Sequence, residues 1–170
     1  MLNEYTIGDS RELLKEVESN TVDLIYIDPP YCTGRDFYHF DDRFSSSADY
    51  RELLLRPLFE ECHRVLTDIG NIVIHVEAKI SHHVRIVLDD VFGEKRFKNE
   101  IVWVSGGNHK SKYQLQRNHD TIIVYQKGSE SIYNAEHKEY DADTVRKAKM
   151  CPVRKKKYNT SALVNRQPNV

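Results

Sequence analysis

The residues best suited to chemistry are Asp28-Pro29-Pro30-Tyr31, which follow the apolar run Val22–Ile27 without a gap. A short apolar run that ends at two prolines predicts a strand buried on both faces, in a parallel sheet. Ligands of open α/β sheets bind beyond the carboxyl ends of their strands, so a site is expected at this tetrapeptide. The Asp28 carboxylate and a carbonyl freed from the sheet supply two adjacent acceptors, and the Tyr31 ring supplies a stacking surface.

Two acceptors beside a flat ring suit the exocyclic amino group of a planar base. The plainer alternative is a strand end with a proline turn, which needs no particular residue at positions 28 and 31.

The elements that must position this tetrapeptide alternate between helix and strand, and an antiparallel strand pair follows them. This order predicts an α/β layered fold with the antiparallel pair at one edge of the sheet. Asp9 or Ser10 can cap the helix expected at Ser10–Glu18, and Pro57 should kink or interrupt the helix expected from about Ser46 to Leu66. Gly93 should end the helix expected at Ser81–Phe92. In chain order we expect helix Ser10–Glu18, strand Val22–Ile27, a loop from Tyr31 to Ser47, a helix from about Ser46 to Leu66 with apolar positions Leu53, Leu54, Leu58, Val65 and Leu66, strand Ile72–Val76, helix Ser81–Phe92, and strands Ile101–Val104 and Thr121–Tyr125.

The composition limits the class of protein. Of 170 residues, 39% are hydrophobic and 30% are charged, which is enough apolar material to bury a core and excludes wholesale disorder. No apolar run is long enough to span a membrane, and the first residues have neither a basic leader nor an apolar core, so we expect no membrane partner. Three well-separated cysteines argue against a disulfide framework and a structural zinc site, and they fit a cytoplasmic location.

The charge is distributed unevenly along the chain. The net charge is −1, but the segment from Arg146 onward holds eight lysines and arginines and no acidic residue. An acidic body with a basic tail suggests that the tail side faces a polyanion, and the alternative is a solvated charged tail.

The sequence around the tetrapeptide resembles the amino-methyltransferases of DNA. The similarity is carried by Gly8-Asp9-Ser10, by residues 28–37 and 40–44, by Gly70–Glu77, by Asn99–Val104 and by residues 119–125. It is greatest to the permuted adenine-specific group, which includes modification subunits of restriction-modification systems. The resemblance implies an S-adenosylmethionine-dependent methyltransferase with a Rossmann-like sheet, in which residues 1–130 form a partial catalytic core and residues 131–170 form the basic start of a target-recognition segment.

The resemblance also assigns roles to residues. The Asp28 carboxylate and the Pro29 carbonyl would accept hydrogen bonds from the target amino group, with Pro30 stiffening the turn. That base would be flipped out of double-stranded DNA and stacked on Tyr31. Asp9 would accept from the adenine of the cofactor, although a helix cap explains it equally well. No metal is implied. The expected loop contacts are Thr33, Gly34, Arg35 and Phe37, and the expected contacts with the DNA backbone are Lys155, Lys156 and Lys157.

Asp28 favours N6 of adenine as the target, because cytosine-amino members of the family more often carry Ser at this position. Methylation of cytosine at N4 is the alternative within the class. The family's glycine-rich turn, of the Phe-x-Gly-x-Gly type, has no counterpart here, since no glycine follows Gly128. We therefore expect a sheet that is incomplete at the C-terminus. A DNA-binding or subunit-assembly module without catalysis is the rival from a different class. A homodimer or a restriction subunit are the expected protein partners.

Overall fold

The computed structural model describes residues 4–34, 44–105, 113 and 118–134, and the backbone alone at 36–37, 40–41, 149–150 and 157–158. The chain divides into two units, Met1–Tyr133 and Asn134–Val170. This division lies close to the boundary expected at residue 130, while the roles of the two parts stay predictions. Among the residues described, no helix is both long and apolar enough to cross a membrane.

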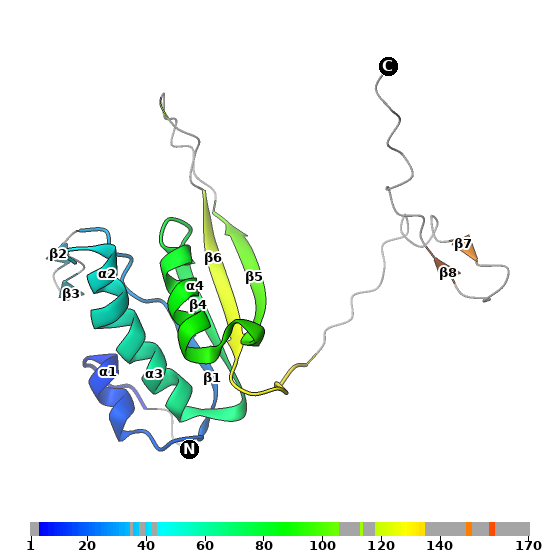
Figure 1. Ribbon diagram of the computed structural model, residues 1–170, viewed down its shortest axis with the longest axis horizontal. Helices are drawn as coiled ribbons and strands as arrows, with labels where there is room; N and C mark the ends of the chain where they lie inside the picture. The colour runs from blue at the N-terminus through cyan, green and yellow to red at the C-terminus, as the bar shows by residue number, and fades with distance from the viewer. Residues whose placement is uncertain are drawn as a thin grey trace. The chain divides into compact units, whose positions relative to one another are not determined.

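Four strands form the main sheet of the first unit, in the order β1-β4-β6-β5 (Figure 1). β1 (Val22–Ile27) is parallel to β4 (Leu66–Glu77). β6 (His119–Gln126) is antiparallel to both β4 and the edge strand β5 (Phe97–Val104). The predicted α/β fold with an antiparallel pair at one edge is therefore confirmed, and β1 has the bounds expected from the sequence.

The hydrophobic core lies between one face of this sheet and the helices α3 (Arg56–Val65) and α4 (Ser81–Phe92). Successive side chains of a strand point to opposite faces, so alternate residues of the central strands β4 and β6 enter the core. Ile72, Ile74 and Val76 do so from β4, and all three are fully buried. α4 ends at Gly93, whose φ of +92° suits a residue without a side chain. Both the bounds of α4 and this ending agree with the sequence prediction.

The first helix is shorter than expected and the second is divided. α1 spans Ser10–Leu13 and continues as a 3₁₀ turn, η1 (Leu14–Glu16). The expected long helix consists of α2 (Ser47–Asp49), a π-helical segment η2 (Tyr50–Leu55) and α3. Another 3₁₀ turn, η3 (Glu94–Arg96), leads into β5.

Pro57 and Arg11 account for the interruption of this helix. Pro57 has no N–H to donate to the carbonyl of Leu53 four residues earlier, and Arg11 Nη1 donates to that oxygen at 2.6 Å. The wider π turns rotate side chains off the helical spacing of the core face. Leu53 is consequently 61% exposed, so its place in the expected apolar set is wrong, and Leu66 belongs to β4 instead of the helix.

The opposite face of the sheet corrects a second expectation. The apolar run of β1 predicts burial on both faces, but Leu24 is 63% exposed and Tyr26 is 58% exposed. β1 is an edge strand of the described sheet, and no described helix covers this side. Trp103 of the other edge strand, β5, is 58% exposed. We call this side the open face.

Short strand pairs complete the described elements. β2 (Asp36–Phe37) and β3 (Phe40–Asp41) pair antiparallel inside the segment expected to be a loop. In the second unit, β7 (Lys149–Met150) and β8 (Lys157–Tyr158) also pair antiparallel.

Candidate active site

The predicted tetrapeptide forms the turn that leaves the carboxyl end of β1. Asp28 is exposed and Pro29 is buried, while Tyr31 is partly buried and packs against the core. The carboxyl ends of the parallel strands β1 and β4 meet at one edge of the sheet, and the turn lies at that edge. The buried proline fixes the backbone and leaves the Asp28 carboxylate accessible to a ligand.

The Asp28 carboxylate lies close enough to the Tyr31 phenol to affect its pKa. Burial raises the pKa of the Tyr31 phenol well above its usual value, and the neighbouring Asp28 carboxylate together with the negative charge of Asp120 raises it further. The phenol therefore stays protonated at neutral pH.

The turn continues through backbone in the left-handed region. Cys32 has φ of +53° and Gly34 has φ of +73°. A non-glycine residue in this region is uncommon and is found disproportionately at functional sites. Thr33 and Gly34 are exposed, as a contact with a ligand requires. Arg35 and the side chain of Phe37 lie outside the described residues.

A polar chain crosses three strands on the open face, next to the turn. The Tyr26 hydroxyl lies 3.0 Å from Nδ1 of His75, and Nε2 of His75 lies 3.5 Å from the carboxylate of Asp120. Ile27 pairs with Ile74, so His75 and Asp28 each follow the last printed pair of this parallel ladder. Nε2 of His75 is buried and has no hydrogen-bond partner at ordinary distance, so Asp120 is the acceptor toward which it points.

On the helical side, Tyr50 contacts the same turn. Its hydroxyl donates to the carbonyl of Pro30 at 2.7 Å, and its side chain is fully buried. Phe44 packs edge-on against the Tyr50 ring, with the ring centres 5.1 Å apart.

Asp9 caps α1, which is one of the two roles expected for it. Its carboxylate accepts from the backbone N–H of Arg11 at 2.9 Å and pairs with the Arg11 guanidinium through Nε and Nη2. The hydrogen bond from the Arg11 side chain is the main reason that the pKa of Asp9 lies below its ordinary value. The cofactor-binding role of Asp9 stays a prediction.

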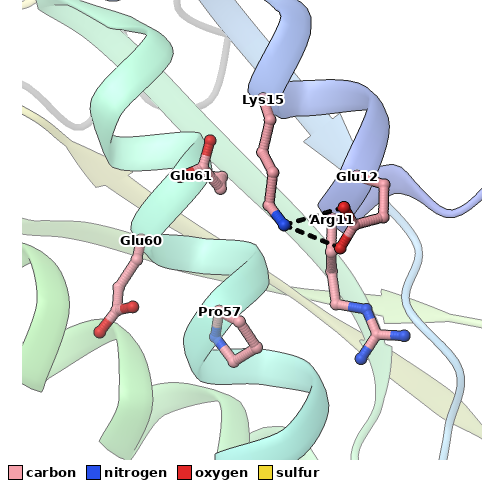
Figure 2. A pocket seen from close by; sticks show the side chains of 6 residues that line it. All are labelled: Arg11, Glu12, Lys15, Pro57, Glu60 and Glu61. Atoms are coloured by element: carbon pink, nitrogen blue, oxygen red, sulfur yellow. Dashed lines mark hydrogen bonds and ion pairs between the residues drawn. The ribbon is translucent and has the colours of Figure 1, made fainter.

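Charged residues of α1, η1 and α3 line a separate pocket of about 320 Å³ (Figure 2). Lys15 is paired there with Glu12, and none of residues 28–31 lines the pocket. Within the described part of the chain, no three His, Cys, Asp or Glu side chains gather in a way that could hold a metal ion. Lys155, Lys156 and the side chain of Lys157 lie outside the described residues, so their contacts with the DNA backbone stay predictions.

The chain has the α/β fold of S-adenosylmethionine-dependent DNA methyltransferases of known structure. Two solved structures share the fold. The PvuII DNA methyltransferase, cytosine-N4-specific, matches with a TM-score of 0.57 and 18% identity, over 74% of this chain and 49% of that one. The putative DNA modification methylase TTHA0409 of Thermus thermophilus, complexed with S-adenosyl-L-methionine, matches with a TM-score of 0.54 and 18% identity, over 76% of this chain and 55% of that one.

Sequence comparison narrows the class to a family. The profile of the family described as DNA methylase matches residues 22–168. The type II methyltransferase M.KpnI of Klebsiella pneumoniae is 35% identical over 132 residues, which are 71% of this chain and 31% of that protein. The type III StyLTI Mod subunit of Salmonella typhimurium is 26% identical over 72% of this chain and 22% of its own length. The chain belongs to the DNA methylase family, and it spans about a third or less of these relatives.

Sequence reasoning found the turn but missed the residues on either side of it. Tyr50 occupies an amphipathic helix pattern, where an aromatic residue indicates only core packing. His75 offered a weak signal, as a polar residue inside the apolar run Ile72–Val76. Asp120 opens a strand, where a structural hydrogen bond is the ordinary interpretation, and its approach to His75 depends on the pairing of β4 with β6.

Proposed function

We propose that this protein methylates the N6 amino group of adenine in DNA, with S-adenosylmethionine as the methyl donor and as part of a restriction-modification system. The observation that carries the proposal is an exposed carboxylate, Asp28, that follows a parallel strand on a turn fixed by the buried Pro29. Family membership supports the reaction class, and relatives such as the StyLTI Mod subunit support the biological setting.

The residues of the turn suit the electronic demand of this reaction. The lone pair of an aromatic amine is delocalised into its ring, so the amine is a poor nucleophile. Hydrogen bonds from the amine to the Asp28 carboxylate and the Pro29 carbonyl favour a tetrahedral nitrogen whose lone pair points at the methyl group. These bonds strengthen as positive charge develops on the nitrogen, so they stabilise the transition state more than the ground state.

The bonds formed and broken balance without a further reactant. The nitrogen–carbon bond forms as the carbon–sulfur bond breaks, the electron pair passes to sulfur, and the methylated nitrogen releases one proton to solvent. A base inside a duplex cannot reach Asp28, so the target must be flipped out, and the half-buried Tyr31 ring offers it a stacking surface.

Asp9 is the described residue best suited to hold the cofactor. When bound, S-adenosylmethionine supplies an electrophilic methyl group, and its adenine carries an amino donor. Both oxygens of the Asp9 carboxylate already accept from Arg11, Oδ1 from the backbone N–H and Oδ2 from Nη2, so the amino group of the cofactor would share this carboxylate with Arg11. The exposed position of Asp9 allows this bond without loss of the helix cap.

Analysis of the methylated nucleosides tests the proposal and separates the two bases. DNA incubated with the purified chain and S-adenosylmethionine is digested, and N6-methyladenine is the expected product. N4-methylcytosine would assign the protein to the alternative specificity of the family. If DNA binding persists without any methylated base, and Asp28→Ala leaves that binding unchanged, the chain is a binding module and the proposal is wrong.

The relatives named as Mod subunits support a restriction partner, and the resemblance to the family suggests a dimer. We propose that the chain works with a restriction subunit or as a homodimer. Sedimentation of the purified chain, alone and with duplex DNA, tests the second possibility, and a monomer in both samples would exclude the homodimer.

A further inference from the structure

Tyr50 is notable because its side chain is fully buried and its hydroxyl hydrogen-bonds to the backbone of the proposed active site. Its hydroxyl donates to the Pro30 carbonyl at 2.7 Å, and the residue has no exposed surface. Pro30 lies in the middle of the turn, two residues after Asp28 and one before Tyr31. This hydrogen bond therefore connects the helical side of the protein to the turn that carries both side chains expected to contact the base.

The position of Tyr50 depends on an unusual piece of backbone. It is the first residue of the π-helical segment η2, and π-helical turns occur often at functional sites. The backbone N–H of Tyr50 donates to the Ser46 carbonyl at 3.1 Å, and Phe44 packs against its ring. The backbone of Tyr50 is thus fixed by the helix and its ring by Phe44.

The turn needs such an anchor. Pro29 and Pro30 have no N–H, so this stretch cannot be tied to the sheet through its own backbone donors. Cys32 follows in the left-handed region, a conformation that a non-glycine residue keeps only when its surroundings impose it. The carbonyl of Pro30 is the acceptor through which a neighbouring element can hold the turn, and Tyr50 uses it.

We infer that Tyr50 is a positioning residue for the proposed methyl transfer, and that its hydroxyl fixes the Pro30 carbonyl and thereby the orientation of Asp28 and Tyr31. The inference rests on the proposed function of the turn. Tyr50 does not touch the base or the cofactor in this account, and its effect on the reaction passes through the backbone of Pro30. Displacement of reacting groups by about 1 Å can lower a rate about a hundredfold, so a loosened turn is expected to lower kcat strongly.

Tyr50→Phe removes the hydroxyl and keeps the ring, and Tyr125→Phe is the matched control. Tyr125 is also fully buried, and its hydroxyl bonds to Asp89 of α4, away from the turn. Each variant loses the hydrogen bond that its phenol donates, so both are expected to unfold at lower denaturant concentration than the wild type. Only Tyr50→Phe is expected to disturb the turn.

The first readout is an NMR experiment that correlates the amide of Tyr31 with the carbonyl carbon of Pro30. Tyr50→Phe should shift this carbonyl and the Asp28 and Tyr31 signals, while Tyr125→Phe should leave all of them in place. Unchanged signals in Tyr50→Phe, in a folded protein, would overturn the inference. This readout needs no methyl transfer, so it stands even if the proposed function fails.

The second readout is kinetic and uses the methylation assay of the previous section. Tyr50→Phe should lower kcat by about tenfold to a hundredfold with little change in KM for S-adenosylmethionine, and Tyr125→Phe should keep the wild-type kcat. Equal rates in the two variants would show that Tyr50 serves stability alone. A wild-type chain without any transfer would count against the proposed function, and the carbonyl signal would still decide the position of the turn.

Discussion

The two faces of the sheet differ in how deeply they bury the side chains of the same strands. On the helical face, Ile74 and Ile123 are almost completely buried against α3 and α4. On the open face, Leu24 and Tyr26 of β1 are more than half exposed, and the polar chain Tyr26–His75–Asp120 lies among apolar neighbours. One face therefore supplies most of the stability, and the other places hydrogen-bonding groups beside the proposed site.

The turn of residues 28–31 lies where these two faces meet. Tyr50 contacts it from the helical side, and the charge of Asp120 acts on Tyr31 from the other. A site at the edge of a sheet can thus be held in place by contacts on one face and surrounded by polar groups on the other. Variants at matched positions on the two faces test whether stability comes mainly from the helical face.

The largest difference is expected between Ile123→Ala and Ile122→Ala, which are neighbours in β6 on opposite faces. Ile123 is 1% exposed, and its truncation should lower the free energy of unfolding by about 2–5 kcal/mol through lost burial and a new cavity. Ile122 is only partly buried, so its truncation should cost less than about 2 kcal/mol. Urea unfolding measures both, and equal losses would contradict the division.

A smaller difference is expected when a hydroxyl is removed from each face. Tyr125→Phe deletes a buried hydrogen bond to the Asp89 carboxylate and should cost about 1.5–3 kcal/mol. Tyr26→Phe deletes the bond to His75 on the open face, where Tyr26 is 58% exposed, and should change stability by no more than about 0.5 kcal/mol. The same unfolding experiment applies, and a larger cost for Tyr26→Phe would show that the polar chain is a stability element.

The smallest effect concerns the cap of α1, which belongs to neither face. Asp9→Ala should cost about 1 kcal/mol, because the backbone N–H of Arg11 loses its acceptor. Asp9→Asn keeps an equally good cap and removes only the ion pair with Arg11, so it should cost less. A cost for Asp9→Asn as large as that for Asp9→Ala would mean that the ion pair, not the cap, stabilises α1.

The pH dependence of the same pair has a definite sign. Arg11 lowers the pKa of Asp9 below its ordinary value of 3.8 in the folded protein. The stability gained from the ionised carboxylate is therefore present above about pH 4 and is lost as the pH falls through the folded-state pKa. The gap in unfolding free energy between wild type and Asp9→Asn should accordingly shrink below pH 4, and a gap that widens there would reverse this assignment.

The sequence predicted the helices and strands whose ends are set by residues close to them in the chain. The bounds of β1 and α4 follow from an apolar run that ends at prolines and from an amphipathic helix that ends at Gly93. The turn at Asp28 followed from its place after β1. Each of these signals is contained within a few residues of the sequence, which is why they could be interpreted without a structure.

The features that sequence reasoning missed depend on residues far apart in the chain. The π-helical segment ends two residues before Pro57, and its Leu53 carbonyl accepts a bond from Arg11, which lies 42 residues earlier in the chain. Leu24 and Tyr26 are exposed because no described helix packs on the open face, which an apolar run does not reveal. The hydrogen bond from Tyr50 to Pro30 spans 20 residues, and nothing in the local pattern of either segment indicates it.

The central claim is that the Asp28 carboxylate drives methyl transfer to a base. Its most direct test is the incorporation of a labelled methyl group from S-adenosylmethionine into DNA by the wild type, Asp28→Asn and Asp23→Asn. Asp23 is an exposed carboxylate of the same strand, paired with the Thr67 hydroxyl and distant from the turn, so it controls for charge. The account predicts wild-type incorporation by Asp23→Asn and a loss of about a hundredfold or more by Asp28→Asn, both in folded proteins. Equal incorporation by the two variants would contradict it.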